Sequence, residues 1–211
     1  MANAPETTRR RRRADGELSR ARIIDAAAEI AAERGYEGTS VAAVSAKCGL
    51  PASSIYWHFT DKDDLIAAVI ERSFGSWLSA WRLPDGGQPR ERMVGMAGQT
   101  LKALLASPDF LRLGLMLALE RRPVEPRART MFLRVRDDAT RAITANMKEL
   151  APGLTDAQAK QLTTFALAGA DGLFIAKEIG GDDVDLPAMF EIHGHALYDI
   201  ATRMLDENEG R

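Results

Sequence analysis

The fold is decided by residues 39–59, which read TSVAAVSAKCGLPASSIYWHF. Ser40 is a good helix N-cap, and Gly49 stands where a short helix would end in a left-handed residue. Ile55 and Phe59 are four residues apart, so they share one face of the next helix. A short helix, a glycine turn and a second helix with a small, polar start together predict a helix-turn-helix.

A helix-turn-helix offers its second helix to the major groove of DNA, with the first residues of that helix facing base edges. Residues 51–54 (Pro-Ala-Ser-Ser) are small enough to let the backbone approach the DNA closely. Tyr56, His58 and, at the start of the next helix, Lys62 can reach phosphates. Taken alone, the pattern also fits an ordinary helical hairpin packed on a core.

The rest of the chain is predicted to be helical as well, because alanine is abundant and alternating β-branched runs are missing. Clusters of glycine and proline separate about nine helices. We expect the fourth of them to begin with an approximate capping box between Thr60 and Asp63. The expected helices span residues 17–34, 41–48, 52–58, 62–82, 89–106, 108–121, 126–150, 155–179 and 186–206.

Composition narrows the class of protein. The 211 residues include 28 Lys and Arg against 30 Asp and Glu, a net charge of −2, and 45% are apolar, which excludes wholesale disorder. The single cysteine, Cys48, excludes a disulfide framework and a multi-cysteine zinc site, and we interpret it as buried filler. Because no apolar run of membrane-spanning length and no signal peptide is found, we expect a cytoplasmic protein without a membrane partner.

Charge is unevenly distributed along the chain. Residues 1–20 hold six arginines against three acids, and residues 21–70 hold four basic against seven acidic residues. A basic arm at Arg9–Arg13 on an acidic body indicates an anionic partner, with a solvated tail as the alternative. Asp25, Glu29 and Glu33 form one stripe of the first helix, which could point away from DNA.

A wider pattern identifies a family. An amphipathic first helix, the turn GYEGTS at 35–40, two short helices and the run IYWHFTDKDDL at 55–65 closely resemble the tetracycline-repressor (TetR) family of bacterial regulators. The resemblance covers about residues 18–70. It implies that the third helix reads bases, that Tyr56 and Lys62 bind phosphate, and that Thr39 and Ser40 contact the phosphate backbone. The expected DNA-binding residues are Arg11, Arg12, Arg13, Thr39, Ser40, Ala52, Ser53, Ser54, Tyr56, Trp57, His58 and Lys62.

Two features depart from the family pattern. Pro51 and Ala52 stand where a lysine or another polar residue is common, which removes one base or phosphate contact. Many members lack an arm such as Arg9–Arg13. We hypothesise that this arm lies in the minor groove or along flanking phosphates and replaces the lost charge.

The same resemblance implies an all-α fold in two parts. An N-terminal three-helix DNA-binding domain with a helix-turn-helix is expected to precede a larger helical domain that dimerises and holds a ligand pocket. The expected boundaries are a disordered basic arm at 1–16, the DNA-binding domain at 17–65 with a bridge helix at 62–82, and the ligand-binding and dimerisation domain at 83–211.

Two helices of the larger domain suit a subunit interface. The eighth expected helix has a smooth face of glycine and alanine, although each glycine inside a helix costs roughly 1 kcal/mol against alanine. The ninth has apolar residues at helical spacing, so the two could form a two-fold four-helix interface, with packing inside one subunit as the alternative. The expected interface residues are Phe165, Gly169, Gly172, Leu173, Ala176, Met189, Phe190, His193, Leu197, Ile200 and Met204.

Apolar and methionine-rich helices before these suit an adaptable pocket, although core packing is the alternative for each single residue. Asp171 is a lone carboxylate in an apolar run, and we expect it to have a structural role rather than to contact a ligand. Arg134, Arg136 and Arg141 are expected on a solvated face, and an inward Arg136 would favour an acidic ligand. The candidate pocket residues are Trp77, Trp81, Met93, Met96, Thr100, Phe110, Leu113, Met116, Phe132, Val135, Phe165 and Asp171.

Other classes of function are not favoured. His193 and His195 are two apart on a helix and point about 200° away from each other, so they do not indicate a metal site. No catalytic motif and no cofactor motif is present, and a helical enzyme is only a remote alternative. The leading hypothesis is a homodimeric repressor that a small, largely apolar ligand releases from a palindromic operator in double-stranded DNA. A regulator without a small-molecule ligand, or an activator, is the alternative.

Overall fold

A computed structural model describes residues 6–78, 82–120 and 126–210, with the side chains of 6–13, 76 and 78 left out of the description. Within these ranges the chain is all-helical, with nine α-helices, one 3₁₀ turn and no strand. It divides into two compact units, residues 1–72 with 112–133 and residues 73–111 with 134–211. The predicted all-α class is therefore confirmed.

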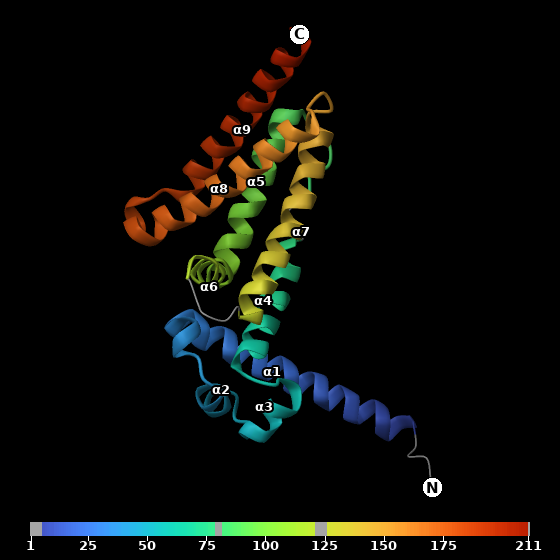
Figure 1. Ribbon diagram of the computed structural model, residues 1–211, viewed down its shortest axis with the longest axis vertical. Helices are drawn as coiled ribbons and strands as arrows, with labels where there is room; N and C mark the ends of the chain where they lie inside the picture. Colours follow the sequence, from blue (N-terminus) through green and yellow to red (C-terminus); the bar gives the residue numbers. More distant parts are fainter. Residues whose placement is uncertain (1–5, 79–81, 121–125, 211) are drawn as a thin grey trace. The chain divides into compact units, whose positions relative to one another are not determined.

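The first unit contains the predicted helix-turn-helix. It consists of α1 (Glu6–Gly38), α2 (Val41–Cys48), α3 (Ala52–His58), the start of α4 (Lys62–Leu78), most of α6 (Pro108–Leu119) and the start of α7 (Arg127–Leu150). Figure 1 shows α2 and α3 beside α1, which is drawn in blue. Ser40 accepts a hydrogen bond from the Ala43 amide, and Gly49 ends α2 at a φ of 67°. Both capping predictions are thus confirmed.

A single cluster of buried side chains holds these helices together. Ile23, Ile24 and Ile30 of α1 pack with Val44 of α2 and Ile55 of α3. Ile55 is the only residue of α3 that is fully buried, and Phe59 follows directly after the helix. Two apolar anchors therefore fix α3 and leave its other faces uncovered.

The first helix is longer than expected. We expect it over residues 17–34, but α1 begins at Glu6, so part of the arm expected to be disordered has a helical backbone. Arginine and alanine are good helix formers, which extends the helix through the basic run. At the other end Gly35 has non-helical angles (φ 67°, ψ −175°) and kinks the helix one residue after the expected end.

The start of α4 is capped one residue later than predicted. Asp61 accepts a hydrogen bond from the Asp64 amide at 2.8 Å, and the Asp64 carboxylate accepts one from the Thr60 amide at 3.0 Å. The predicted box between Thr60 and Asp63 is therefore wrong. Asp63 is engaged by other helices instead.

The second unit is built around three long helices. They are α5 (Pro89–Ala106), α8 (Asp156–Gly180) and α9 (Leu186–Glu209), joined by parts of α4, α6 and α7 and by a 3₁₀ turn at Gly181–Asp183. Helix α9 packs on both α5 and α8. A Cβ at Gly194 would lie 2.8 Å from the Val94 Cα, so the glycine allows α9 to approach α5 closely. Apart from α1, each helix ends within four residues of the expected bounds.

Candidate DNA-binding face

The surface of α3 carries half of the residues that the sequence assigns to DNA binding. Tyr56 is 58% exposed and Trp57 is 76% exposed, values that are unusual for large aromatic side chains. Ala52 and Ser53 are also exposed, and Ser54 and His58 are half-buried. Because the core takes only Ile55 from this helix, these six side chains are wholly or partly accessible to a partner.

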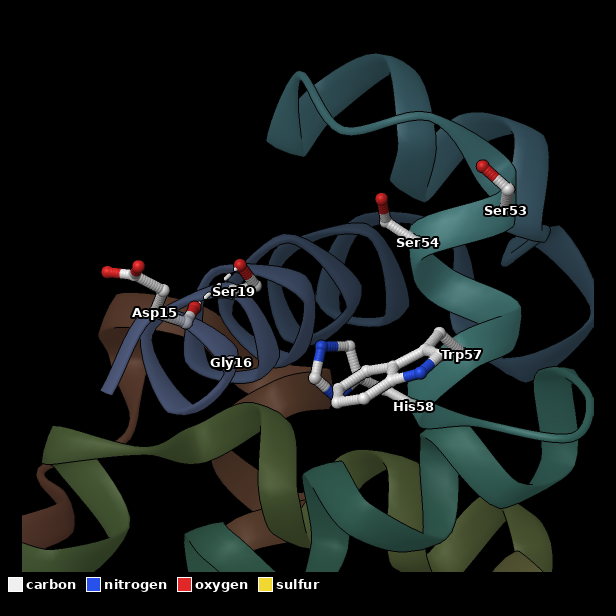
Figure 2. Close-up of a pocket in the computed structure, with 7 residues that line it drawn as sticks. All are labelled: Asp15, Gly16, Ser19, Ser53, Ser54, Trp57 and His58. Carbon is white, nitrogen blue, oxygen red and sulfur yellow. Dashed lines mark hydrogen bonds between the residues drawn. The ribbon is translucent and has the colours of Figure 1, made fainter. Parts of the chain in front are cut away.

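A groove of about 380 Å³ lies between α1 and α3. Figure 2 shows its lining, in which the indole of Trp57 reaches across to the backbone of Gly16. The groove is lined by Asp15, Gly16, Ser19, Ser53, Ser54, Trp57 and His58. Three hydroxyl groups and one carboxylate therefore face the space beside the reading helix.

His58 lies beneath Trp57 and supports it. The two rings meet edge to face, with 4.6 Å between their centroids. Burial and the positive charge of Arg20 lower the pKa of His58 below its ordinary value of 6.5. The imidazole is therefore neutral at neutral pH and offers a phosphate a hydrogen bond at most, not a charge.

The two residues before α2 have different environments. Ser40 is exposed, as its expected phosphate contact requires. Thr39 is only 1% exposed, and its hydroxyl donates to the Gly35 carbonyl at 2.9 Å. The Thr39 hydroxyl is therefore engaged within the chain, and the phosphate contact expected at this residue stays a prediction. The kink at Gly35 leaves a carbonyl without its helical partner, and the threonine satisfies it.

Lys62 is bound to α1 rather than projecting into solvent. Its ammonium group donates to the Tyr36 carbonyl at 3.2 Å, lies 4.3 Å from the centre of the Tyr36 ring and is 3.5 Å from the Glu37 carboxylate. A cation at the end of a helix is stabilised by the last carbonyl groups. In this structure the family's phosphate-binding lysine therefore caps α1.

Other cations of the first unit also have partners within the chain. Lys47 binds Glu29 at 2.7 Å and Glu33 at 3.7 Å, and Arg22 donates to the Cys48 carbonyl at 2.8 Å. The acidic stripe of α1 is thus used to hold α2 in place. The third acid of that stripe, Asp25, binds Arg72 of α4 at 2.7 Å.

The basic arm is only partly described. The backbone of Arg9–Arg13 belongs to the first turns of α1. The side chains of Arg11, Arg12 and Arg13, which we expect to bind DNA, lie outside the described residues.

The candidate pocket residues are divided between the two units. In the second unit Trp77, Met93, Met96, Thr100, Phe110 and Val135 are buried, and Phe165 is 48% exposed. In the first unit Leu113 and Phe132 are buried, and Met116 packs against Gly35 while its side chain stays 48% exposed. Trp81 lies outside the described residues. Their assignment to a pocket stays a prediction.

One buried ion pair corrects the prediction for Arg136. Its guanidinium donates to both oxygens of Asp171, at 3.1 and 2.6 Å, and the side chains are only 23% and 18% exposed. Arg136 therefore does not lie on a solvated face, whereas Arg134 and Arg141 are exposed. Burial raises the pKa of Asp171 above its ordinary value of 3.8, against the opposing charge of Arg136.

Several residues of the expected dimer interface pack inside the subunit instead. Phe190 and Leu197 are 1% and 2% exposed. The His193 ring bonds to the Ala166 carbonyl at 3.0 Å and occupies the space where a Cβ of Gly169 would lie. Burial lowers the pKa of His193. These contacts favour the intrasubunit alternative for Phe190 and Leu197, and the interface role of Gly169 and His193 stays a prediction.

A different apolar face on α8 and α9 is open. We call it the α8–α9 face and define it by Phe165, Gly172, Ile175, Ala176, Ile179, Met189 and Ile192, all of which are exposed. Leu173, Ile200 and Met204 are half-buried beside it. Sequence reasoning missed Ile175, Ile179 and Ile192. The sequence pattern that would have predicted the α8 part of this face is a second stripe of apolar and small residues at helical spacing. It consists of positions 165, 168, 172, 175, 176 and 179.

Comparison with known proteins agrees with the geometry of α1–α4. Residues 23–69 match the model of a family described as bacterial regulatory proteins, tetR family. A transcriptional repressor of Rhodococcus jostii, KstR, is 30% identical over 89 residues, 42% of this chain and 42% of that protein. The transcriptional regulator BetI of Burkholderia ambifaria is 24% identical over 87% of this chain and 94% of its own length.

The likeness extends to the fold of the whole chain. The regulator FadR of Bacillus subtilis, solved in complex with stearoyl-CoA, has a TM-score of 0.67 at 19% identity, over 83% of this chain and 96% of that one. The alignments with the first curated relatives span less than half the length of those proteins, 42%. At these identities the structural likeness shows the fold alone.

Fold and site together support the class of a helix-turn-helix transcriptional regulator. Its buried anchors, its exposed reading helix and the family match over α1–α4 all agree on this class. Over residues 23–69 the chain matches the tetR family of bacterial regulatory proteins, and its relatives and structural neighbours support membership of that family. No described helix is both long and apolar enough to span a bilayer, and within the described ranges no three His, Cys, Asp or Glu side chains are placed to hold a metal ion.

Proposed function

We propose that the chain is a homodimeric repressor that acts on DNA in the cytoplasm and binds a palindromic operator through α3. The observation that carries the proposal is the surface of α3, where Ser53, Tyr56 and Trp57 are exposed on a helix held by Ile55. A motif of this kind places the start of its second helix against base edges in the major groove. The relatives named as repressors support repression over activation.

Positive charge for the DNA backbone comes mainly from the arm in this proposal. Arg22, Lys47 and Lys62 are engaged by carbonyl or carboxylate groups of the same chain. This leaves the run Arg9–Arg13, with Arg20 and Arg34, to neutralise phosphates. Since affinity for DNA depends on counterions released by such contacts, removal of the run reduces both the affinity and its salt dependence.

Dimerisation is assigned to the α8–α9 face. A contiguous apolar surface on a protein of this kind marks an interaction site more often than not. A second copy of the chain fits it, because a two-fold pair of α8 and α9 would cover the same residues on both subunits. Two subunits then present two copies of α3 to the two halves of a palindrome.

A small, largely apolar ligand is proposed as the effector. The buried side chains around Trp77, Met93 and Phe110 are apolar, and a structural neighbour was solved with stearoyl-CoA. A ligand releases DNA only if it binds the released conformation more tightly than the DNA-bound one. A regulator that uses no small molecule is the alternative, and a bound organic molecule in the purified protein would argue against it.

The experiment that tests the proposal is the selection of bound duplexes from a random library, at moderate salt and without added ligand. Enrichment of a palindromic site is expected for wild type. Tyr56→Ala, on the exposed face of α3, is expected to lose that enrichment. Leu105→Ala, at an exposed leucine in α5, is the matched control and should keep it. Failure of a folded wild-type protein, shown to carry no bound ligand, to enrich any sequence would contradict the proposal.

A further inference from the structure

Trp57 of α3 is in contact with α1 at Gly16. A Cβ built on Gly16 would lie 3.7 Å from Cζ3 and 3.8 Å from Cη2 of the indole, which is ordinary van der Waals contact. Figure 2 shows the ring extending from α3 toward this point of α1. The side chain is nevertheless 76% exposed, so it is not part of the core. The contact therefore joins two helices at the protein surface.

The indole faces the backbone of Gly16 at a distance that would also admit a Cβ. Gly16 lies in the interior of α1, where glycine costs roughly 1 kcal/mol against alanine. Its bare backbone gives the flat indole a surface on which to rest. The indole also meets the His58 ring edge to face, at 4.6 Å between centroids and an interplanar angle of 86°. The indole thus has an aromatic neighbour on its own helix and lies beside the backbone of α1.

The contact lies next to the basic run. Helix α1 continues from Gly16 to Glu6 without a break, and the backbone of Arg9–Arg13 forms the turns in between. Seven residues of helix cover about 10 Å, so the run begins within two turns of the indole. A helix held at Gly16 has little freedom in where its next two turns lie. Trp57 therefore adds a second point at which α1 meets α3, beyond the buried anchor at Ile23 and next to the basic run, and limits bending of the extension.

We propose that Trp57 is a positioning residue, which docks the N-terminal extension of α1 against α3 so that Arg9–Arg13 meets the phosphates flanking the major groove that α3 reads. The inference rests on the proposed function and adds a role that a direct base contact would not give. The carboxylate of Asp15 in the same groove makes the groove itself a poor phosphate site, so the phosphates are assigned to the arginines beyond it.

A double-mutant cycle separates positioning from direct contact. The four proteins are wild type, Trp57→Ala, a variant with Arg9 to Arg13 all replaced by Gln, and the combination. Glutamine keeps the helix propensity of the run and removes its charge. The measurements are operator affinity and the slope of log K against log salt, where each lost phosphate contact changes the slope by about 0.9.

Positioning predicts that Trp57→Ala weakens operator binding about tenfold or more and flattens the slope in the wild-type background, and that it has no further effect once the arginines are gone. An equal loss in both backgrounds would show that Trp57 contacts DNA itself and would overturn the inference, as would no loss in either. Tyr56→Ala is the control, because Tyr56 does not line the groove and should lose affinity equally in both backgrounds.

A second readout needs no DNA. Hydrogen exchange of backbone amides around Gly16 should be faster in Trp57→Ala than in wild type, because the extension loses its contact. Unchanged exchange there would overturn the docking even if the affinity falls. If wild type binds no operator at all while exchange still responds to Trp57→Ala, the proposed function fails and the docking stands. Because Trp57 is exposed, its truncation leaves the core intact.

Discussion

Asp63 in the first turn of α4 caps the N-terminus of α7, with 3.2 Å between its Oδ1 and the backbone nitrogen of Ala128. Its other oxygen accepts the Arg127 amide, and the Tyr36 hydroxyl donates to Oδ1 at 3.0 Å. One carboxylate thus joins α1, α4 and α7. Two of the amides that a helix leaves without an intrahelical partner at its start are satisfied by a different helix.

Replacement of Asp63 by Asn should loosen this junction. The amide side chain keeps one acceptor oxygen and loses the charge that favours a helix N-terminus, so the free energy of unfolding should fall by about 0.5–2 kcal/mol. The Arg127 and Ala128 amides should exchange with solvent faster, as measured by NMR. Asp64→Asn, which affects only the local cap at Thr60 and a distant pair with Arg127, is the control. Equal exchange in both variants would refute the capping role.

Lys62→Met should act through the fold rather than through phosphate. Methionine keeps the length of the side chain and removes the ammonium that caps α1 at Tyr36. We expect a lower urea midpoint and a salt slope of operator binding that stays at the wild-type value, measured by fluorescence anisotropy. The variant with Arg9–Arg13 replaced by glutamine should instead keep the urea midpoint and show a flatter salt slope of operator binding. If the salt slope of Lys62→Met falls by about one per site, Lys62 binds phosphate as the family resemblance implies.

The Arg136–Asp171 pair gives a pH dependence with a definite sign. Burial raises the pKa of Asp171, so the folded state holds this proton more tightly than the unfolded state. The resulting stability is fully present below the ordinary pKa of 3.8 and is lost as the pH rises through the folded-state pKa. Urea unfolding from about pH 3.5 to about pH 6.5 should therefore show wild type losing stability relative to Asp171→Asn as the pH rises. A wild-type protein that gains stability relative to Asp171→Asn as the pH rises would contradict the raised pKa of Asp171.

The same pair should be costly to break from one side only. Arg136→Met leaves the Asp171 carboxylate half-buried without its partner and should cost about 1–3 kcal/mol at neutral pH, less than a fully buried pair because water reaches both side chains. The double variant Arg136→Met with Asp171→Leu should regain much of that loss. A double variant as unstable as the sum of the single variants would argue against a direct coupling.

Ile192→Asp should dissociate the proposed dimer. Ile192 is 59% exposed on the α8–α9 face, and Leu105 of α5, outside that face, is 57% exposed. The buried charge should weaken the dimer at least tenfold, which corresponds to about 1.4 kcal/mol. Sedimentation equilibrium of Ile192→Asp and Leu105→Asp makes the comparison at matched exposure. The same dissociation constant for both would place the interface elsewhere.

Local signals explain what could be predicted from sequence. The N-cap at Ser40, the left-handed Gly49 and the shared face of Ile55 and Phe59 depend only on neighbours within a few residues, and the structure has all three. The length of α1 was underestimated because a run of like charges suggests disorder, although arginine itself favours helix.

Features that depend on a second helix were harder to predict. Whether Thr39 faces solvent depends on the kink at Gly35, and whether Lys62 is available depends on Tyr36 lying beneath it. Helices α8 and α9 each have two apolar stripes, and the sequence alone does not say which stripe packs against a neighbouring helix of the same subunit. His193 and Phe190 were therefore placed on the outer face, and Ile175 and Ile192 were missed.

The anchoring of α3 by Ile55 has an evolutionary consequence. A helix that commits one of its seven residues fully to the core can change most of the others without loss of the fold. Substitutions at Ala52, Ser53 or Tyr56 are then tested almost entirely on which operator they recognise. Under the proposed function, descendants of such a chain can acquire new operators by a few point mutations while the buried anchors of the fold are inherited unchanged.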